Sequence, residues 1–162
     1  MSTNDAMSTE TTAEADRGRQ VTVDIEVRYA ETDQMGIVHH AVYPVWFELA
    51  RTRLCTETGY HYAQIEELGY FLMVSGVEVR YLKGAHYGDT VAITCWLHEI
   101  RSRTLRFGYE VKRGDGTDVA RGFTDHVWVE RESGKACRIP AELKEPFYRV
   151  AGREPGARKN RS

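Results

Sequence analysis

The sequence predicts an α+β domain in which an antiparallel sheet of about five strands curls around one long central helix. Three observations lead to this prediction. A segment of alternating apolar and polar residues comes first, a segment with helical periodicity follows it, and further alternating segments separated by turn residues come last. A helix and a sheet that each have one apolar face can bury both faces when the sheet wraps around the helix.

The first strand and the central helix are predicted from their periodicities. Alternation from Val21 places five apolar side chains on one face of a strand: Val21, Val23, Ile25, Val27 and Tyr29. The helix is expected to begin near Pro44, since a helix tolerates proline in its first turn, and to run to about Glu57. Gly59 is placed to end it as a left-handed cap. This helix should have a broad buried face.

Four more strands are predicted after a short second helix, which is expected between His61 and Leu68. The strands share an alternating pattern and cover residues 71–82, 90–100, 104–112 and 119–130. Turn residues connect them, including Gly88-Asp89 and Gly114-Asp115-Gly116. We therefore expect the later strands to be antiparallel neighbours.

One continuous domain is expected over residues 21–148. The 162 residues are 41% hydrophobic, which is enough for one core and hardly enough for two. Residues 1–20 are rich in Ser, Thr, Asp, Glu and Ala, and residues 149–162 are basic and contain Gly and Pro. Both ends are expected to be disordered tails.

Composition excludes several classes of function. A formal net charge of -2 gives no basic field for a general nucleic-acid binder. No signal-peptide core or membrane-spanning run is found, so we expect no membrane insertion and a cytoplasmic protein. The three cysteines are far apart and lack the close pairing that a zinc site needs. No metal and no other cofactor are expected.

The loop before the central helix carries the most unusual combination of residues. Between Thr32 and His40 lie a carboxylate, a flexible glycine and two imidazoles. The free amides and positive dipole end of a helix attract a carbonyl oxygen, most strongly when it becomes an oxyanion. Asp33 beside that helix end could attack the carbonyl directly or activate a water molecule, and the residues leave both routes open.

Simpler structural explanations exist for the same residues. Asp33 could cap a turn through neighbouring backbone amides. The two histidines could pack or titrate at the surface, and without a third ligand they make a poor metal site. Tyr43 is expected in the first helical turn, beside any cleft. Glu48 is either a functional acid or a surface partner of Arg51.

The segment from Tyr29 to Arg51 reads Y-A-E-T-D-Q-M-G-I-V-H-H-A-V-Y-P-V-W-F-E-L-A-R and resembles the signature of hot-dog-fold acyl-CoA thioesterases. The most similar groups are the 4-hydroxybenzoyl-CoA thioesterases and the bacterial thioesterases associated with the Tol-Pal system. The resemblance extends over residues 21–147 through the strand order, the Gly88-Asp89 turn and the final strand F-T-D-H-V-W-V.

The resemblance implies that Asp33 is the catalytic carboxylate and that the backbone amide of His40 polarises the thioester carbonyl. It also implies that basic residues in the hairpin between the middle strands hold the phosphates of CoA, although a solvated turn is the alternative there. The expected substrate-binding residues are Gly36, Val38, Tyr43, Glu48, Arg101, Ser102 and Arg103.

The predicted reaction is hydrolysis of an acyl-CoA thioester to a free acid and CoA, by a homodimer or homotetramer. Two alternatives keep the fold: a thioesterase that acts on acyl carrier protein, and a non-catalytic module that binds acyl-CoA. The sequence departs from the commonest family pattern at Met35, His39 and Pro44. These residues lie along the expected acyl pocket, so they leave the identity of the acyl group open.

Overall fold

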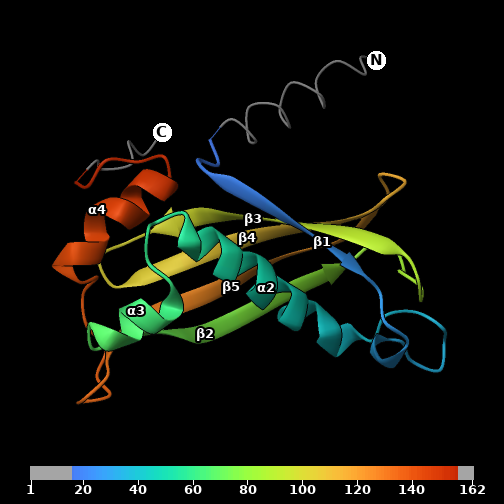
Figure 1. Ribbon diagram of the computed structural model, residues 1–162, viewed down its shortest axis with the longest axis horizontal. Helices are drawn as coiled ribbons and strands as arrows, with labels where there is room; N and C mark the ends of the chain where they lie inside the picture. The colour runs from blue at the N-terminus through green and yellow to red at the C-terminus, as the bar shows by residue number, and fades with distance from the viewer. Residues whose placement is uncertain (1–15, 157–162) are drawn as a thin grey trace.

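The computed structural model describes residues 16–156, so residues 1–15 and 157–162 of the two expected tails lie outside it. Five antiparallel strands form one sheet in the order β1-β3-β4-β5-β2. The helix α2 lies across one face of this sheet (Figure 1). The predicted class, a five-stranded antiparallel sheet curled over a helix, is therefore confirmed.

All of the predicted strands are present, with ends shifted by only a few residues. They are β1 (Gln20–Glu26), β2 (Tyr70–Tyr81), β3 (Thr90–Ile100), β4 (Thr104–Arg113) and β5 (Asp118–Glu130). The helices are α2 (Tyr43–Thr56), α3 (Tyr62–Glu67) and α4 (Ala141–Val150), and two short 3-10 turns are η1 (Tyr29–Glu31) and η2 (His40–Val42). The expectation that the later strands are antiparallel neighbours holds for β3, β4 and β5 but is wrong for β2 and β3, since β2 pairs with β5 at the edge opposite β1.

The helix α2 has 14 residues, and it begins where the sequence predicts. Pro44 occupies its first turn, where a helix amide has no acceptor within the helix. Gly59 has a φ of 89°, as expected for a left-handed residue after the helix end. The buried face carries mainly apolar side chains: Tyr43, Trp46, Phe47, Ala50, Leu54 and Cys55.

The predicted position of Tyr29 is wrong. The strand β1 ends at Glu26, and the chain then turns into η1, so the alternation stops before it reaches Tyr29. Val27 is fully buried, whereas Tyr29 is 77% exposed. The side chain of Tyr29 packs edge-on against Tyr87 instead of entering the core.

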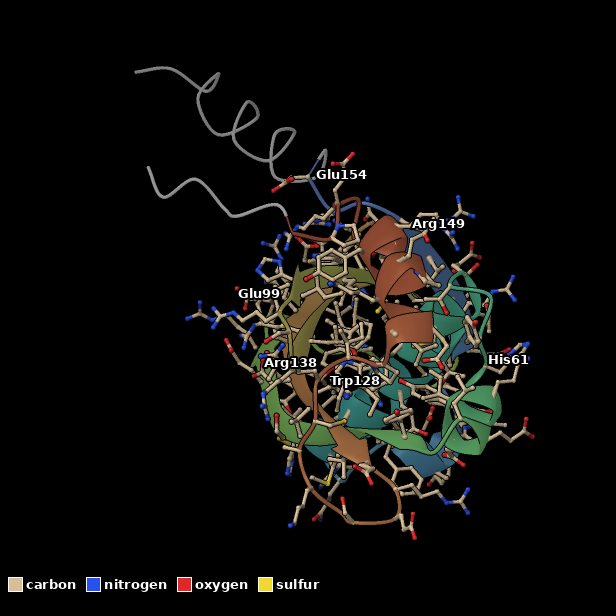
Figure 2. The ribbon with its side chains drawn as sticks, turned by 90° about the vertical axis from the view of Figure 1, so that its left-hand side faces the viewer. His61, Glu99, Trp128, Arg138, Arg149 and Glu154 are labelled. Carbon is tan, nitrogen blue, oxygen red and sulfur yellow. The ribbon has the colours of Figure 1, made fainter. Side chains whose placement is uncertain are left out.

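The described ends of the chain pack more closely than the sequence suggests. Helix α4, which was not predicted, runs past the expected tail boundary at residue 149 and buries Leu143, Phe147 and Val150. Trp128 lies in the interior beside α4, while Glu99 and Arg138 point outward (Figure 2). At the other terminus, Arg17 pairs with Glu110 at 2.6 Å, so the ordered part begins before residue 21.

The two ends of the sheet are built differently. One end brings together residues 27–42, the start of α2 and the β2–β3 connection, and the opposite end carries α4 and the β3–β4 turn (Figure 1). Strand β3 has 11 residues, which corresponds to about 35 Å at roughly 3.3 Å per residue. Over residues 16–156, no helix is both long and apolar enough to cross a lipid bilayer.

Candidate active site

The loop that contains Asp33 is a tight turn closed by its own backbone. The amide of Asp33 donates to the carbonyl of Ile37, and the amide of Gly36 donates back to the carbonyl of Asp33, both at 2.9 Å. Gly36 has a φ of 77°, which other residues rarely adopt. Asp33 Oδ1 accepts a hydrogen bond from the amide of Met35 at 2.8 Å. Asp33 therefore caps a turn, and this bond occupies only one of its two carboxylate oxygens.

The same loop is fastened to the β2–β3 connection. The amide of Val38 donates to the carbonyl of Ala85 at 2.8 Å, and Ile37 forms an isolated bridge with His86. A Cβ atom at Gly84 would lie 2.8 Å from the side chain of Ile37, so only glycine allows this approach. The Asp33 turn consequently has a fixed position relative to the sheet.

The buried carboxylate of Glu31 anchors the loop to α2. It accepts hydrogen bonds from the guanidinium and the backbone amide of Arg28, each at 2.9 Å, and from Trp46 Nε1 at 3.2 Å. Burial alone would raise the pKa of Glu31, but the bonds from Arg28 and Trp46 outweigh it and hold the pKa below its usual value. Glu31 is therefore ionised and structural, a role that sequence analysis missed.

The chain enters α2 through η2, and this entry leaves one amide without an acceptor among residues 16–156. The amide of His39 donates to the carbonyl of Glu31 at 2.8 Å, and the amide of Ala41 donates to His39 Nδ1 at 3.1 Å. His40 is the first residue of η2, where a helical amide has no acceptor within its own helix. Its N–H is thus suited to receive a carbonyl oxygen from a ligand.

A cavity of about 250 Å³ opens beside His40. Four of the predicted site residues line it: Asp33, Val38, His40 and Tyr43. The rest of its wall comes from the Asp33 turn and from the end of β2 with the connection that follows: Met35, Ile37, Tyr81, Leu82, Lys83 and Gly84. Residues 81–84 were not predicted, because the signal that places them here is a tertiary contact and not a local motif.

Tyr43 forms the buried floor of this region. It is 2% exposed, and its ring packs edge-on against the rings of Trp46 and Tyr81. Burial, with a smaller contribution from Tyr81, raises the pKa of Tyr43 to about 12. Its hydroxyl consequently stays protonated at neutral pH.

The structure separates the remaining predicted residues from the cavity wall. Glu48 is exposed on α2. Of its two alternatives, the surface pairing with Arg51 is wrong, because the guanidinium of Arg51 turns inward to the hydroxyls of Tyr62 and Tyr109 at 3.0 and 3.2 Å. Within one chain, the Arg101–Arg103 turn lies at the end of the sheet opposite the cavity. Residues 16–156 contain no cluster of three metal-ligating side chains.

Comparison with known proteins places this chain in a family. A family model described as the thioesterase-like superfamily matches residues 27–147. YneP of Bacillus subtilis, which is named provisionally as an acyl-CoA thioesterase, is 37% identical over 72% of this chain and 84% of its own length.

Solved structures agree with the sequence match. A hypothetical protein of Thermus thermophilus has a TM-score of 0.75 at 37% identity, over 81% of this chain and 97% of its own. A DHNA-CoA thioesterase of Staphylococcus aureus has a TM-score of 0.70 at 30% identity, over 74% and 80% of the two chains. The chain therefore belongs to the hot-dog-fold acyl-CoA thioesterases of the thioesterase-like superfamily, a family of thioester hydrolases.

Proposed function

We propose that this protein hydrolyses an acyl-CoA thioester to a free acid and CoA, with Asp33 as the catalytic carboxylate. One observation carries the proposal: Asp33 and the free amide end at His40 line the same cavity. A carboxylate and a preorganised N–H donor are the two groups that acyl transfer needs. The cavity wall is otherwise mostly apolar, which suits an acyl group.

The His40 amide polarises the thioester carbonyl in both possible routes. In the first, an Asp33 oxygen bonds to the carbonyl carbon, the C–S bond breaks and CoA leaves as a thiolate. Water then cleaves the mixed anhydride and restores the carboxylate. In the second, Asp33 takes a proton from the attacking water, and that proton passes to the departing sulfur. The bond from Met35 orients Oδ1, while no partner within the described residues occupies the other oxygen.

The proposed functional unit is a homodimer, and apolar side chains exposed on one side of the chain support it. Strand β2 is an edge strand, and α2 presents Val45 and Leu49 outward at 53% and 50% exposure. Along β2, the exposed apolar side chains are Phe71, Met73, Val74, Val77 and Tyr81. A second copy could extend the sheet through antiparallel pairing of the two β2 strands. This interface would also cover the exposed Glu48 on α2.

In a dimer of this kind, the Arg101–Arg103 turn can contribute to substrate binding in the opposite subunit. In an antiparallel β2–β2 pair, the end of one sheet that carries the Arg101–Arg103 turn lies beside the end of the other sheet that carries the cavity. The partner subunit would therefore bring this turn toward the cavity. The turn is exposed, and Arg101 is already paired with Glu99 at 2.9 Å. We propose that the turn holds the phosphates of CoA bound in the opposite subunit.

The test is the release of CoA from a panel of benzoyl, hydroxybenzoyl, short-chain and long-chain acyl-CoAs, followed with a thiol reagent. Asp33→Asn is the informative variant, because an asparagine oxygen can still accept the Met35 amide and keep the turn. We expect kcat to fall by roughly 10²–10⁴-fold, the range for loss of a catalytic acid-base group. Asp24→Asn, an exposed change on β1, is the matched control and should keep the native rate.

The thiol reagent requires a cysteine control, and two results would contradict the proposal. Cys137 is partly exposed and can react with the reagent, so all proteins carry Cys137→Ser. If no acyl-CoA is hydrolysed by the native protein, an acyl-carrier-protein thioesterase or a binding module replaces the proposal. If Asp33→Asn keeps the native rate, hydrolysis stands but Asp33 is not its catalytic carboxylate.

A further inference from the structure

Tyr81, the last residue of β2, connects the sheet to the residue that offers the free amide. Its hydroxyl donates a hydrogen bond to the carbonyl oxygen of His40 at 2.8 Å. We propose that Tyr81 is a positioning residue, which fixes His40 so that its N–H points at the thioester carbonyl. This inference rests on the proposed function and assigns a role to a residue outside the Asp33 loop.

The carbonyl of His40 can accept a hydrogen bond from Tyr81 besides the one that its own turn provides. His40 opens the 3-10 turn η2, in which a carbonyl pairs with the amide of the third following residue, here Tyr43. The fourth following residue is Pro44, which has no N–H, so no α-helical bond competes for the second lone pair of this oxygen. The Tyr81 hydroxyl uses that lone pair.

The hydroxyl of Tyr81 is held by rigid parts of the molecule. Its backbone pairs with Ala120 in β5, and the next amide, that of Leu82, donates to the carbonyl of Val119 at 2.9 Å. Its ring meets the buried ring of Tyr43 edge-on, with centroids 5.2 Å apart. A group carried by a sheet sets a geometry more accurately than a group on a loop.

Residue 40 is thus fixed on both sides. The amide bonds of Val38 and His39 hold the chain before it, and the Tyr81 hydroxyl holds its carbonyl. Without the hydroxyl, the η2 turn can pivot and move the His40 amide away from the substrate oxygen. A displacement of about 1 Å at a catalytic group can cost up to roughly 10²-fold in rate. We expect a smaller loss here, because the amide itself remains.

The test compares Tyr81→Phe with the native protein on the best acyl-CoA of the panel. Phenylalanine keeps the ring, the cavity wall and any contact of that ring with a second subunit. We expect kcat to fall by roughly 3- to 30-fold, with KM, the midpoint of thermal unfolding and the oligomeric state unchanged. Tyr87→Phe is the control, since that side chain is 65% exposed and lies outside the cavity wall.

A spectroscopic measurement separates positioning from any effect on stability. In an Asp33→Asn background the bound thioester persists, and its ¹³C-labelled carbonyl stretch reports the strength of the hydrogen bond from the His40 amide. Adding Tyr81→Phe should move this band toward the value of free substrate.

Each contrary outcome has its own meaning. A native kcat for Tyr81→Phe, a rise in KM at unchanged kcat, or an unmoved band overturns the inference and leaves the hydrolase assignment intact. Absence of turnover by the native protein overturns the proposed function and the inference with it.

Discussion

Two polar clusters share helix α2, and they differ in where they lie: one lines a cavity, whereas the other is buried, with His126 Nδ1 as a buried atom that has no partner among the described residues. At the N-terminal end of α2, Asp33 keeps one carboxylate oxygen without a partner among the described residues, and the amide of His40 starts a turn with no acceptor in its own helix. Two turns further along, Arg51 leads into a buried chain of hydrogen bonds. The first cluster can therefore act on a ligand, whereas the second can only hold the protein together.

The buried chain of hydrogen bonds runs from α3 to β5. Arg51 donates to the hydroxyls of Tyr62 and Tyr109, Tyr109 bonds to Thr124 Oγ1 at 2.7 Å, and Thr124 bonds to His126 Nε2 at 2.9 Å. Burial by itself would lower the pKa of Arg51, but its interactions with the two tyrosines raise it, so the guanidinium stays charged. Burying a charge is costly unless hydrogen bonds surround it, and this network supplies them.

The comparison predicts that changes at the cavity alter rate and changes in the network alter stability. After Asp33→Asn, the largest expected effect is that of His40→Pro, which removes the amide hydrogen together with the imidazole. Proline suits this position, because His39 has an extended backbone with ψ of 139° and proline favours the first residue of a helical turn. We expect a loss of roughly 10²–10³-fold in kcat, measured as CoA release.

His40→Ala is the matched variant for this prediction. It keeps the amide and removes the imidazole, so it should retain most of the native rate. Equal activity of the proline and alanine variants would show that the amide is not the donor. Loss of activity in both would assign the role to the imidazole instead.

The next largest effect is a pH dependence that comes from His126. Burial first, and the charge of Arg51 second, lower the pKa of His126 from 6.5 to about 4. Between these pH values the unfolded chain binds a proton that the folded protein does not. The free energy of unfolding should therefore decline as pH falls from about 6.5 toward 4, by at most roughly 3 kcal/mol from this residue.

Urea unfolding at several pH values measures this slope in the native protein and in His126→Gln. The variant should lose stability less steeply over the same pH range, whatever its stability at pH 7. His61→Gln, an exposed change, serves as the control and should keep the native slope. Parallel curves for the native protein and His126→Gln would mean that His126 titrates normally in the folded state.

The smallest effect concerns Tyr109→Phe. The ring should still stack on Phe47, where the centroids lie 4.2 Å apart, but Arg51 and Thr124 lose a hydrogen-bond partner. Removing a buried acceptor from a charged donor costs about 1–3 kcal/mol, which chemical denaturation can measure. We expect kcat to remain native below the unfolding transition. A lowered kcat at full folding would show that the network and the cavity are coupled.

Local patterns in the sequence predicted much of the fold, and they singled out the loop that lines the cavity. Alternation identified the five strands, and Pro44 with Gly59 marked the ends of α2. Asp33 was selected because a carboxylate before a helix start has a recognisable chemistry, and the resemblance to the thioesterases pointed to the amide of His40. Tyr29 was misplaced because alternation cannot show where a strand ends. Helix α4 was missed because its periodicity is short and Pro146 interrupts it.

The sequence by itself determined the catalytic carboxylate candidate, the helix that follows it and the succession of strands along the chain, because these depend on neighbours in the sequence. Only the tertiary structure decided that Tyr81 and residues 82–84 complete the cavity, and that Arg51 turns inward instead of pairing with Glu48. These partners lie far apart in the sequence and meet because the sheet folds over α2. The hydrophobic periodicity and the composition of the sequence do not specify such contacts, since many pairings of the strands are compatible with the same alternation of apolar and polar residues.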